Sequence, residues 1–176
     1  MAQFRMSAPK RRPEAVLLDI DDTLYPYDPC HRAGLAAMQG LLEGELGVGA
    51  EAFEDAFARA RDEVKARLGE TASAHSRLLY AGRLLELLGM RSQPATALRL
   101  EAAYWRDFLL VCERFAGVEE LLLETRLHNI PVCVVTDLTM PMQYRKLFHL
   151  GLSELVDWLV TSEETTGDKV TLGPYL

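Results

Sequence analysis

The sequence contains no apolar run of the length that a membrane-spanning helix requires. Its 176 residues nowhere approach about 18 consecutive apolar residues, and the N-terminus lacks an apolar stretch of the signal-peptide kind. We therefore expect a cytoplasmic protein with no membrane partner. Because 49% of the residues are hydrophobic and 26% are charged, the composition is typical of a globular protein that buries a core.

Cysteine is also scarce. Cys30, Cys112 and Cys133 are odd in number, lie far apart and form no CxxC pair. This spacing indicates neither a disulfide framework nor a zinc site. We expect three reduced thiols, most of them buried.

Basic residues are outnumbered by acidic ones. The chain has 19 Lys and Arg against 26 Asp and Glu, for a formal net charge of -7. Because nucleic acids and anionic membranes bind basic surfaces, this balance argues against both as partners and favours a small molecule. Residues 1–13 are an exception, since they are rich in Arg and Lys. We predict a flexible leader there and assign it no function.

Three short apolar segments predict the strands of a parallel sheet. The first covers residues 15–18 and runs into an acidic cluster, while the later ones, at 130–135 and 156–160, are rich in apolar and β-branched residues. Amphipathic segments at 117–127 and 143–150 predict the helices that connect them. The expected fold class is therefore α/β with a parallel sheet.

A long helical block interrupts this scaffold. Residues 30–112 carry four apolar stripes at helical spacing, separated by glycines and by Pro94. We predict four helices that form a unit inserted into an α/β core of residues 14–29 and 113–176. Residues 25–29 contain two prolines, which predict a loop between the first strand and the insert.

Polar residues follow each predicted strand, and the carboxyl ends of strands in open parallel sheets bind ligands. Asp19 and Asp21 stand two residues apart after the first strand, so an extended backbone points both side chains the same way. Two close carboxylates repel each other, and a divalent cation is the usual remedy. We interpret Asp22 as a solvent-facing cap of the turn, and Thr23 as either a turn residue or a reactant.

Three motifs in order carry a resemblance to a known family. The segment DIDDTL, which begins at Asp19, resembles the first signature of the haloacid dehalogenase (HAD) superfamily, Asp-x-Asp-x-Thr after an apolar strand. VCVVTD, with Thr136, is similar to the second signature, and TSEETTGDK, with Lys169, is similar to the third. The helical block stands where one branch of the superfamily carries a cap over the active site.

This resemblance implies a phosphohydrolase with a Rossmann-like core and Mg²⁺ as cofactor. Asp19 would be the nucleophile that becomes an aspartyl-phosphate, and Asp21 the general acid and base. Thr136 would donate its hydroxyl to the phosphoryl group, and Lys169 would balance the negative charge. The Asp19 carboxylate and the Asp21 carbonyl would hold the metal ion. An aspartate at position 21 favours phosphate chemistry over dehalogenation, because displacement of a halogen needs no acid there.

Four further residues are candidates for binding the substrate, and each has a plainer reading. Thr23 and Asp137 adjoin the proposed reacting groups, but both also suit the turns that follow strands. His75 and Arg77 lie in TASAHSRLLY, the most polar break in the insert, from which a cap would reach the site. The alternative is an ordinary helix start with exposed His and Arg side chains.

The stretch from residue 134 to residue 152 resembles a subgroup in which phosphatases accompany nucleotide-sugar enzymes. Gln143, Arg145 and Lys146 carry this likeness. It points to a sugar phosphate as substrate, while the alternative places these three side chains on the exposed surface of a helix.

The resemblance is incomplete after Lys169. The fourth signature of the superfamily, which supplies further acidic metal ligands, has no counterpart, and Lys169 is followed by valine instead of the usual proline. We therefore expect the C-terminal part of the core to be missing and one sheet edge to be open, which would favour pairing into a homodimer.

The function we predict is that of a Mg²⁺-dependent phosphohydrolase acting on a small phosphate monoester. The alternative is a truncated, catalytically weak binding or regulatory module.

Overall fold

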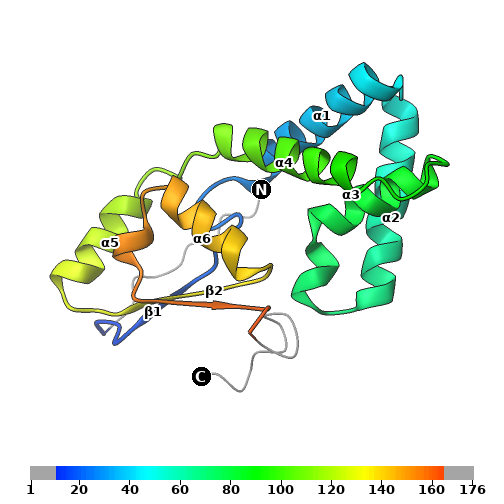
Figure 1. Cartoon of the computed structure of the whole chain (residues 1–176). Helices are drawn as coiled ribbons and strands as arrows, with labels where there is room; N and C mark the ends of the chain where they lie inside the picture. The colour runs from blue at the N-terminus through cyan, green and yellow to red at the C-terminus, as the bar shows by residue number, and fades with distance from the viewer. Residues whose placement is uncertain (1–10, 165–176) are drawn as a thin grey trace, which may run out of the picture.

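A computed structural model describes residues 11–164, which form an α/β fold (Figure 1). The strands of the described part are β1 (Val16–Leu18), β2 (Val132–Thr136) and β3 (Trp158–Thr161). They form one parallel sheet in the order β1-β2-β3. The predicted fold class, a parallel sheet of the α/β kind, is confirmed.

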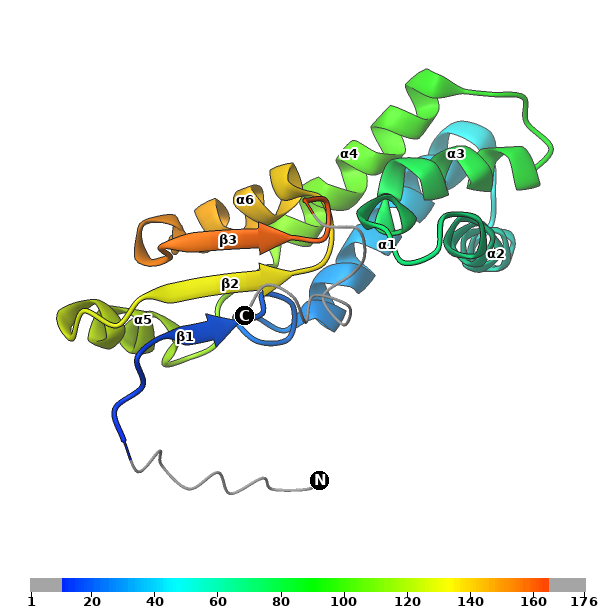
Figure 2. The same cartoon turned by 90° about the horizontal axis from the view of Figure 1, so that it is seen from below.

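Helices α5 (Val118–Leu127) and α6 (Met140–His149) cover one face of the sheet, and both views show them on the same side (Figures 1 and 2). The β2 side chains that alternate toward these helices are buried, whereas Leu17 and Trp158 are 50% and 59% exposed. Leu17 and Trp158 both pair in register with Cys133, so they lie on the opposite face. That face is apolar and half-open to solvent in the described residues.

The insert consists of four α-helices and one 3₁₀ helix between β1 and β2. They are α1 (Tyr27–Leu46), α2 (Ala50–Leu68), η1 (Ala72–His75), α3 (Arg77–Leu87) and α4 (Pro94–Leu110). The loop predicted at residues 25–29 is wrong for its second half, because α1 begins at Tyr27. Pro29 is tolerated there because the first turn of a helix leaves its amides unbonded. No described helix is long and apolar enough to cross a membrane.

Helices α1 and α4 pack side by side and connect the rest of the insert to the α/β part of the chain (Figure 1). They approach so closely at Gly34 that a Cβ atom there would lie 2.6 Å from the Tyr104 ring. The strands of the sheet run with their carboxyl ends toward the insert (Figure 2). At the junction the Tyr25 and Phe108 rings meet edge to face, 6.0 Å apart. This arrangement brings the insert over the sheet edge where the acidic cluster lies.

Candidate active site

The acidic cluster follows β1 in a tight turn. The Asp19 carboxylate accepts a hydrogen bond from the Ile20 amide at 2.8 Å. Asp22 has a left-handed backbone, with φ at 57°, and its exposed side chain accepts from the Tyr27 amide at 2.8 Å. Asp22 therefore links the turn to the start of α1, as its predicted capping role requires.

A cavity of about 220 Å³ lies where this turn, the end of β2 and the insert meet. It is lined by Asp19, Asp21, Asp22, Tyr27, His75, Arg77, Thr136, Asp137, Leu138 and Lys146. The volume is below the roughly 300–1,000 Å³ of pockets for drug-sized ligands. The cavity therefore suits a small ligand.

The cavity brings together residues that are far apart in sequence. Six of the eight predicted site residues line it, namely Asp19, Asp21, His75, Arg77, Thr136 and Asp137. Thr23 lies exposed in the turn and is not among the lining residues. Lys169 lies outside the described residues.

Asp21 is held by two groups that the sequence prediction did not assign to the site. The Tyr25 hydroxyl donates to Asp21 Oδ1 at 2.5 Å, and Lys146 Nζ donates to the same oxygen at 2.6 Å. Burial lowers the pKa of Lys146, and the Asp21 carboxylate opposes this shift. Burial also raises the pKa of Tyr25, and Asp21 adds to that effect. A buried ammonium thus faces the proposed general acid.

The alternative that Gln143 and Lys146 lie on a helix surface is wrong, because both side chains are 0% exposed. They lie three residues apart on α6, on the same face as the buried Met142, Leu147 and Leu150. Their place within this apolar stripe was the signal in the sequence. A polar residue in a buried helical stripe needs a partner, and Asp21 supplies one to Lys146.

Gln143 orients the end of β2. Its amide nitrogen donates to Thr136 Oγ1 at 2.9 Å and to the Asp137 carbonyl. Thr136 is 1% exposed. The next loop turns sharply, since Leu138 has a φ of 88°, and its amide donates to Ser162 Oγ at 3.1 Å. This turn keeps the Thr136 hydroxyl at the edge of the cavity.

Arg77 begins α3 but does not lie exposed at a helix start. It is 8% exposed, and its Nη atoms donate to the His75 carbonyl and to the Tyr27 hydroxyl, both at 2.7 Å. His75 is half-buried beside it. The insert therefore contributes a buried cation to the cavity wall.

The donors around Asp19 and Asp21 are oxygen atoms, which are the ligands that Mg²⁺ prefers. Within residues 11–164 no three His, Cys, Asp or Glu side chains cluster in a way that would hold a metal ion. A Mg²⁺ ion at this position would take the Asp19 carboxylate and the Asp21 carbonyl as protein ligands, and water would have to supply the remaining oxygens.

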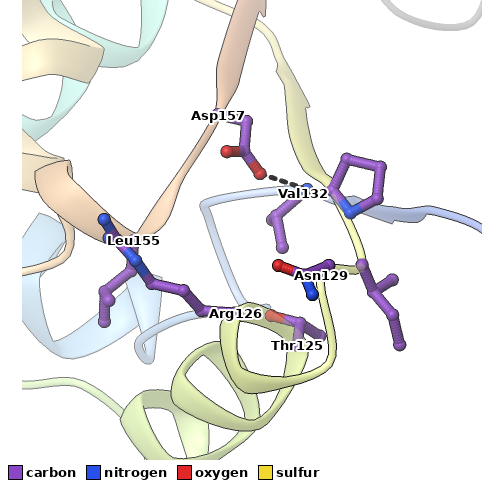
Figure 3. Close-up of a pocket in the computed structure, with 8 residues that line it drawn as sticks. Thr125, Arg126, Asn129, Val132, Leu155 and Asp157 are labelled. Carbon is purple, nitrogen blue, oxygen red and sulfur yellow. Dashed lines mark hydrogen bonds between the residues drawn. The ribbon is translucent and has the colours of Figure 1, made fainter.

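A second cavity, of about 310 Å³, lies at the opposite end of β2 (Figure 3). There Asp157 accepts from the Val132 amide at 2.7 Å, and the Arg126 guanidinium donates to the Glu154 carbonyl. These side chains are engaged with the backbone. This cavity is the larger, but the paired acids, the threonine and the buried cations all lie around the smaller one, which we take as the candidate active site.

Two curated phosphatases are similar to the chain. No family model matches the chain. The ribulose-1,5-bisphosphate 5-phosphatase of Halopiger xanaduensis is 40% identical over 156 residues, which cover 88% of this chain and 65% of the relative. The glyceraldehyde 3-phosphate phosphatase of Methanopyrus kandleri is 27% identical over 157 residues, covering 89% of this chain and 64% of the relative.

A solved structure also resembles the chain. It is the HAD-hydrolase YfnB of Bacillus subtilis in a magnesium-bound form, with a TM-score of 0.60, 20% identity, and coverage of 89% of this chain and 68% of that one. The chain therefore shares the fold of this HAD hydrolase. It spans 65% and 64% of the lengths of the two curated phosphatases it matches.

Proposed function

We propose that this chain is a member of the haloacid dehalogenase superfamily and a Mg²⁺-dependent phosphatase that acts on a small sugar phosphate through an aspartyl-phosphate at Asp19. The observation that carries the proposal is one cavity lined by Asp19, Asp21 and Thr136 together with the buried cations Lys146 and Arg77. A phosphate ester needs a nucleophile, an acid, and donors for its oxygens, and this cavity contains all three. The names of the two curated relatives support a sugar phosphate as substrate.

Asp19 is the proposed nucleophile. Its Oδ1 accepts from the Ile20 amide, which limits the rotation of the carboxylate at the strand end. A carboxylate oxygen bonds to phosphorus while the bond from phosphorus to the leaving alcohol breaks. A bound Mg²⁺ would neutralise charge between this carboxylate and the phosphate.

Asp21 is the proposed general acid and base. It gives a proton to the leaving alcohol oxygen, and then takes one from the water that cleaves the aspartyl-phosphate and releases inorganic phosphate. Its hydrogen bonds from Tyr25 and Lys146 share Oδ1, so they orient the carboxylate and leave Oδ2 for the substrate.

The remaining roles concern the phosphoryl oxygens. Thr136, fixed by Gln143, would donate its hydroxyl to one of them. Lys169 would balance charge, a role that rests on the family resemblance, and the binding roles of Thr23, Asp137, His75 and Arg77 stay predictions. The insert would act as a cap that excludes water from the reaction.

The decisive experiment measures phosphate release from an aryl phosphate and from small sugar phosphates, with and without Mg²⁺. We expect Mg²⁺-dependent turnover that Asp19→Asn reduces by at least about 10³-fold. Asp62→Asn, at an exposed position on α2, is the matched control and should leave turnover unchanged. Equal activity of wild type and Asp19→Asn would exclude the proposed mechanism. Phosphate binding without turnover would favour the catalytically weak binding module instead.

A further inference from the structure

Arg77 carries a buried positive charge that no carboxylate among the described residues balances. Arg77 is 8% exposed, and a guanidinium stays protonated at any physiological pH. Within residues 11–164 no carboxylate forms an ion pair with it. Buried charges in proteins are normally paired with an opposite charge. Arg77 therefore stands out among the residues of the cavity.

The groups around Arg77 are neutral. One Nη atom donates to the His75 carbonyl and the other to the Tyr27 hydroxyl. The rings of Tyr104, Trp105 and Tyr80 lie 5.1, 5.5 and 5.5 Å from its central carbon. These contacts hold the guanidinium in one orientation but bring no negative charge.

The guanidinium also keeps unused donors. Nε is buried and has no hydrogen-bond partner among the described residues. A guanidinium has five N–H donors in a planar fork that suits the paired oxygens of a carboxylate or phosphate. Since Arg77 lines the cavity that contains Asp19, an anion that enters this cavity lies next to a guanidinium whose donors are not all used.

The other buried cation of the cavity, Lys146, already has a counter-charge. Lys146 pairs with Asp21 and lies 6.0 Å from the centre of the Trp105 ring, which is also in contact with Arg77. Both cations thus lie near the Trp105 ring. Lys146 reaches it from the α/β core and Arg77 from the insert. The reacting phosphate belongs beside Asp19 and Thr136, on the core side.

We infer that Arg77 binds a second anionic group of the substrate. The substrate class is a small phosphate monoester that carries, besides the reacting phosphate, another phosphate or a carboxylate. This inference rests on the proposed function, because Asp19 defines which phosphate reacts. It makes Arg77 the residue that determines specificity for substrates with a second anionic group over substrates whose only anionic group is the reacting phosphate.

Matched substrates test the inference. Propane-1,3-diol bisphosphate and its monophosphate differ only in the second phosphate, and 3-phosphoglycerate and glycerol 3-phosphate differ only in a carboxylate. In at least one of these pairs, we expect kcat/KM of the wild-type chain to be about 10- to 100-fold higher for the substrate that carries the second anion. The pair with the larger ratio shows whether that anion is a phosphate or a carboxylate.

Arg77→Met removes the charge and keeps an apolar side chain among the aromatic rings. We expect the ratio of kcat/KM values between the two members of the preferred pair to fall by at least about 10-fold in this variant. The fall should come mostly from a higher KM for the substrate with the second anion. Arg77→Lys should retain part of the preference, because the charge stays while the fork is lost. Arg83→Met, on the same helix but in an ion pair with Glu63 outside the cavity, is the control and should keep the full preference.

Binding to the Asp19→Asn chain separates this inference from the proposed function. Calorimetry with the same ligand pairs should show the preference for the second anion, and Arg77→Met in that background should abolish it. Preferential binding with no turnover by the wild type would contradict the proposed function and support the Arg77 inference. The inference would be overturned if the wild type turned over both members of each pair equally well. It would also be overturned if a folded Arg77→Met chain lost kcat/KM equally for both members of a pair.

Discussion

The helical insert and the sheet differ in how completely they bury their apolar side chains. In the insert, Tyr104 and Phe108 are fully buried between helices that contribute to one shared core. In the sheet, Leu17 and Trp158 leave half or more of their surface in contact with solvent. Within residues 11–164, helices α5 and α6 cover the other face (Figure 1). The insert is thus packed from within, whereas the sheet has one packed face and one open face.

This difference locates the chemistry. The candidate active site lies in neither region, but where the insert meets the carboxyl ends of the strands (Figure 2). Its acids come from the turn after β1 and, in the case of Asp137, from the end of β2, and its buried cations come from α6 and from the insert. A site built across such a boundary can open and close if the two regions move relative to each other.

The largest expected effect on stability is in the packed insert. Phe108 is fully buried and touches the ring of Tyr25 across the junction and the ring of Tyr27 within the insert. Phe108→Ala removes these contacts and leaves a cavity, so we expect the free energy of unfolding to fall by about 3–5 kcal/mol. Chemical denaturation measures it. A loss below about 1 kcal/mol would show that the insert is not the better-packed region.

The second effect concerns the boundary. Lys146→Met keeps the packing against Phe108 but removes the hydrogen bond to Asp21, so we expect kcat to fall by about 10²-fold with little change in KM. Lys146→Arg should restore part of kcat, because it returns a donor. Steady-state kinetics of the three chains measures this, with Lys65→Met on the exposed face of α2 as control. An unchanged kcat in Lys146→Met would show that Asp21 is positioned without it.

The third effect is an acid sensitivity of the insert. His31 Nδ1 lies 2.6 Å from the Tyr104 hydroxyl, and burial lowers the pKa of His31 from 6.5 to about 4. Between these pH values the unfolded chain binds the proton that the folded chain excludes, so stability is full above pH 6.5 and falls as the pH decreases. The expected loss at pH 4 is at most about 3 kcal/mol.

Denaturation at several pH values tests this effect. We expect His31→Gln to remove that part of the pH dependence, whereas His128→Gln, at an exposed position after α5, should not. The same pH dependence in His31→Gln as in wild type would contradict the prediction.

The smallest effect is expected on the open face of the sheet. Trp158 is 59% exposed, so Trp158→Ser removes little buried area, and we expect the free energy of unfolding to change by less than about 1 kcal/mol. Comparison with Phe108→Ala by the same denaturation assay makes the contrast between the regions quantitative. A loss of several kcal/mol would show that this face is covered in the folded protein.

Much of the fold was predictable because local patterns agree with the final structure. β-branched runs, helical stripes and the glycines between them placed the strands and helices within a few residues of their observed bounds. The error at Tyr27 arose because the two prolines were taken to exclude a helix, although the first turn of a helix accepts proline. Arg77 was predicted as a candidate from the polar break in the insert, but Lys146 was not assigned to the site, since a polar residue in a stripe does not reveal its partner.

The order of the motifs along the chain determined by itself that Asp19, Asp21 and Thr136 would meet, because parallel strands bring their carboxyl ends to one edge. Only the tertiary structure decided what surrounds them. Lys146 reaches Asp21, and Arg77 lies buried without a carboxylate, through contacts between segments 50 or more residues apart. Whether a charged side chain is buried, and whether it has a counter-charge, depends on which distant elements pack against it.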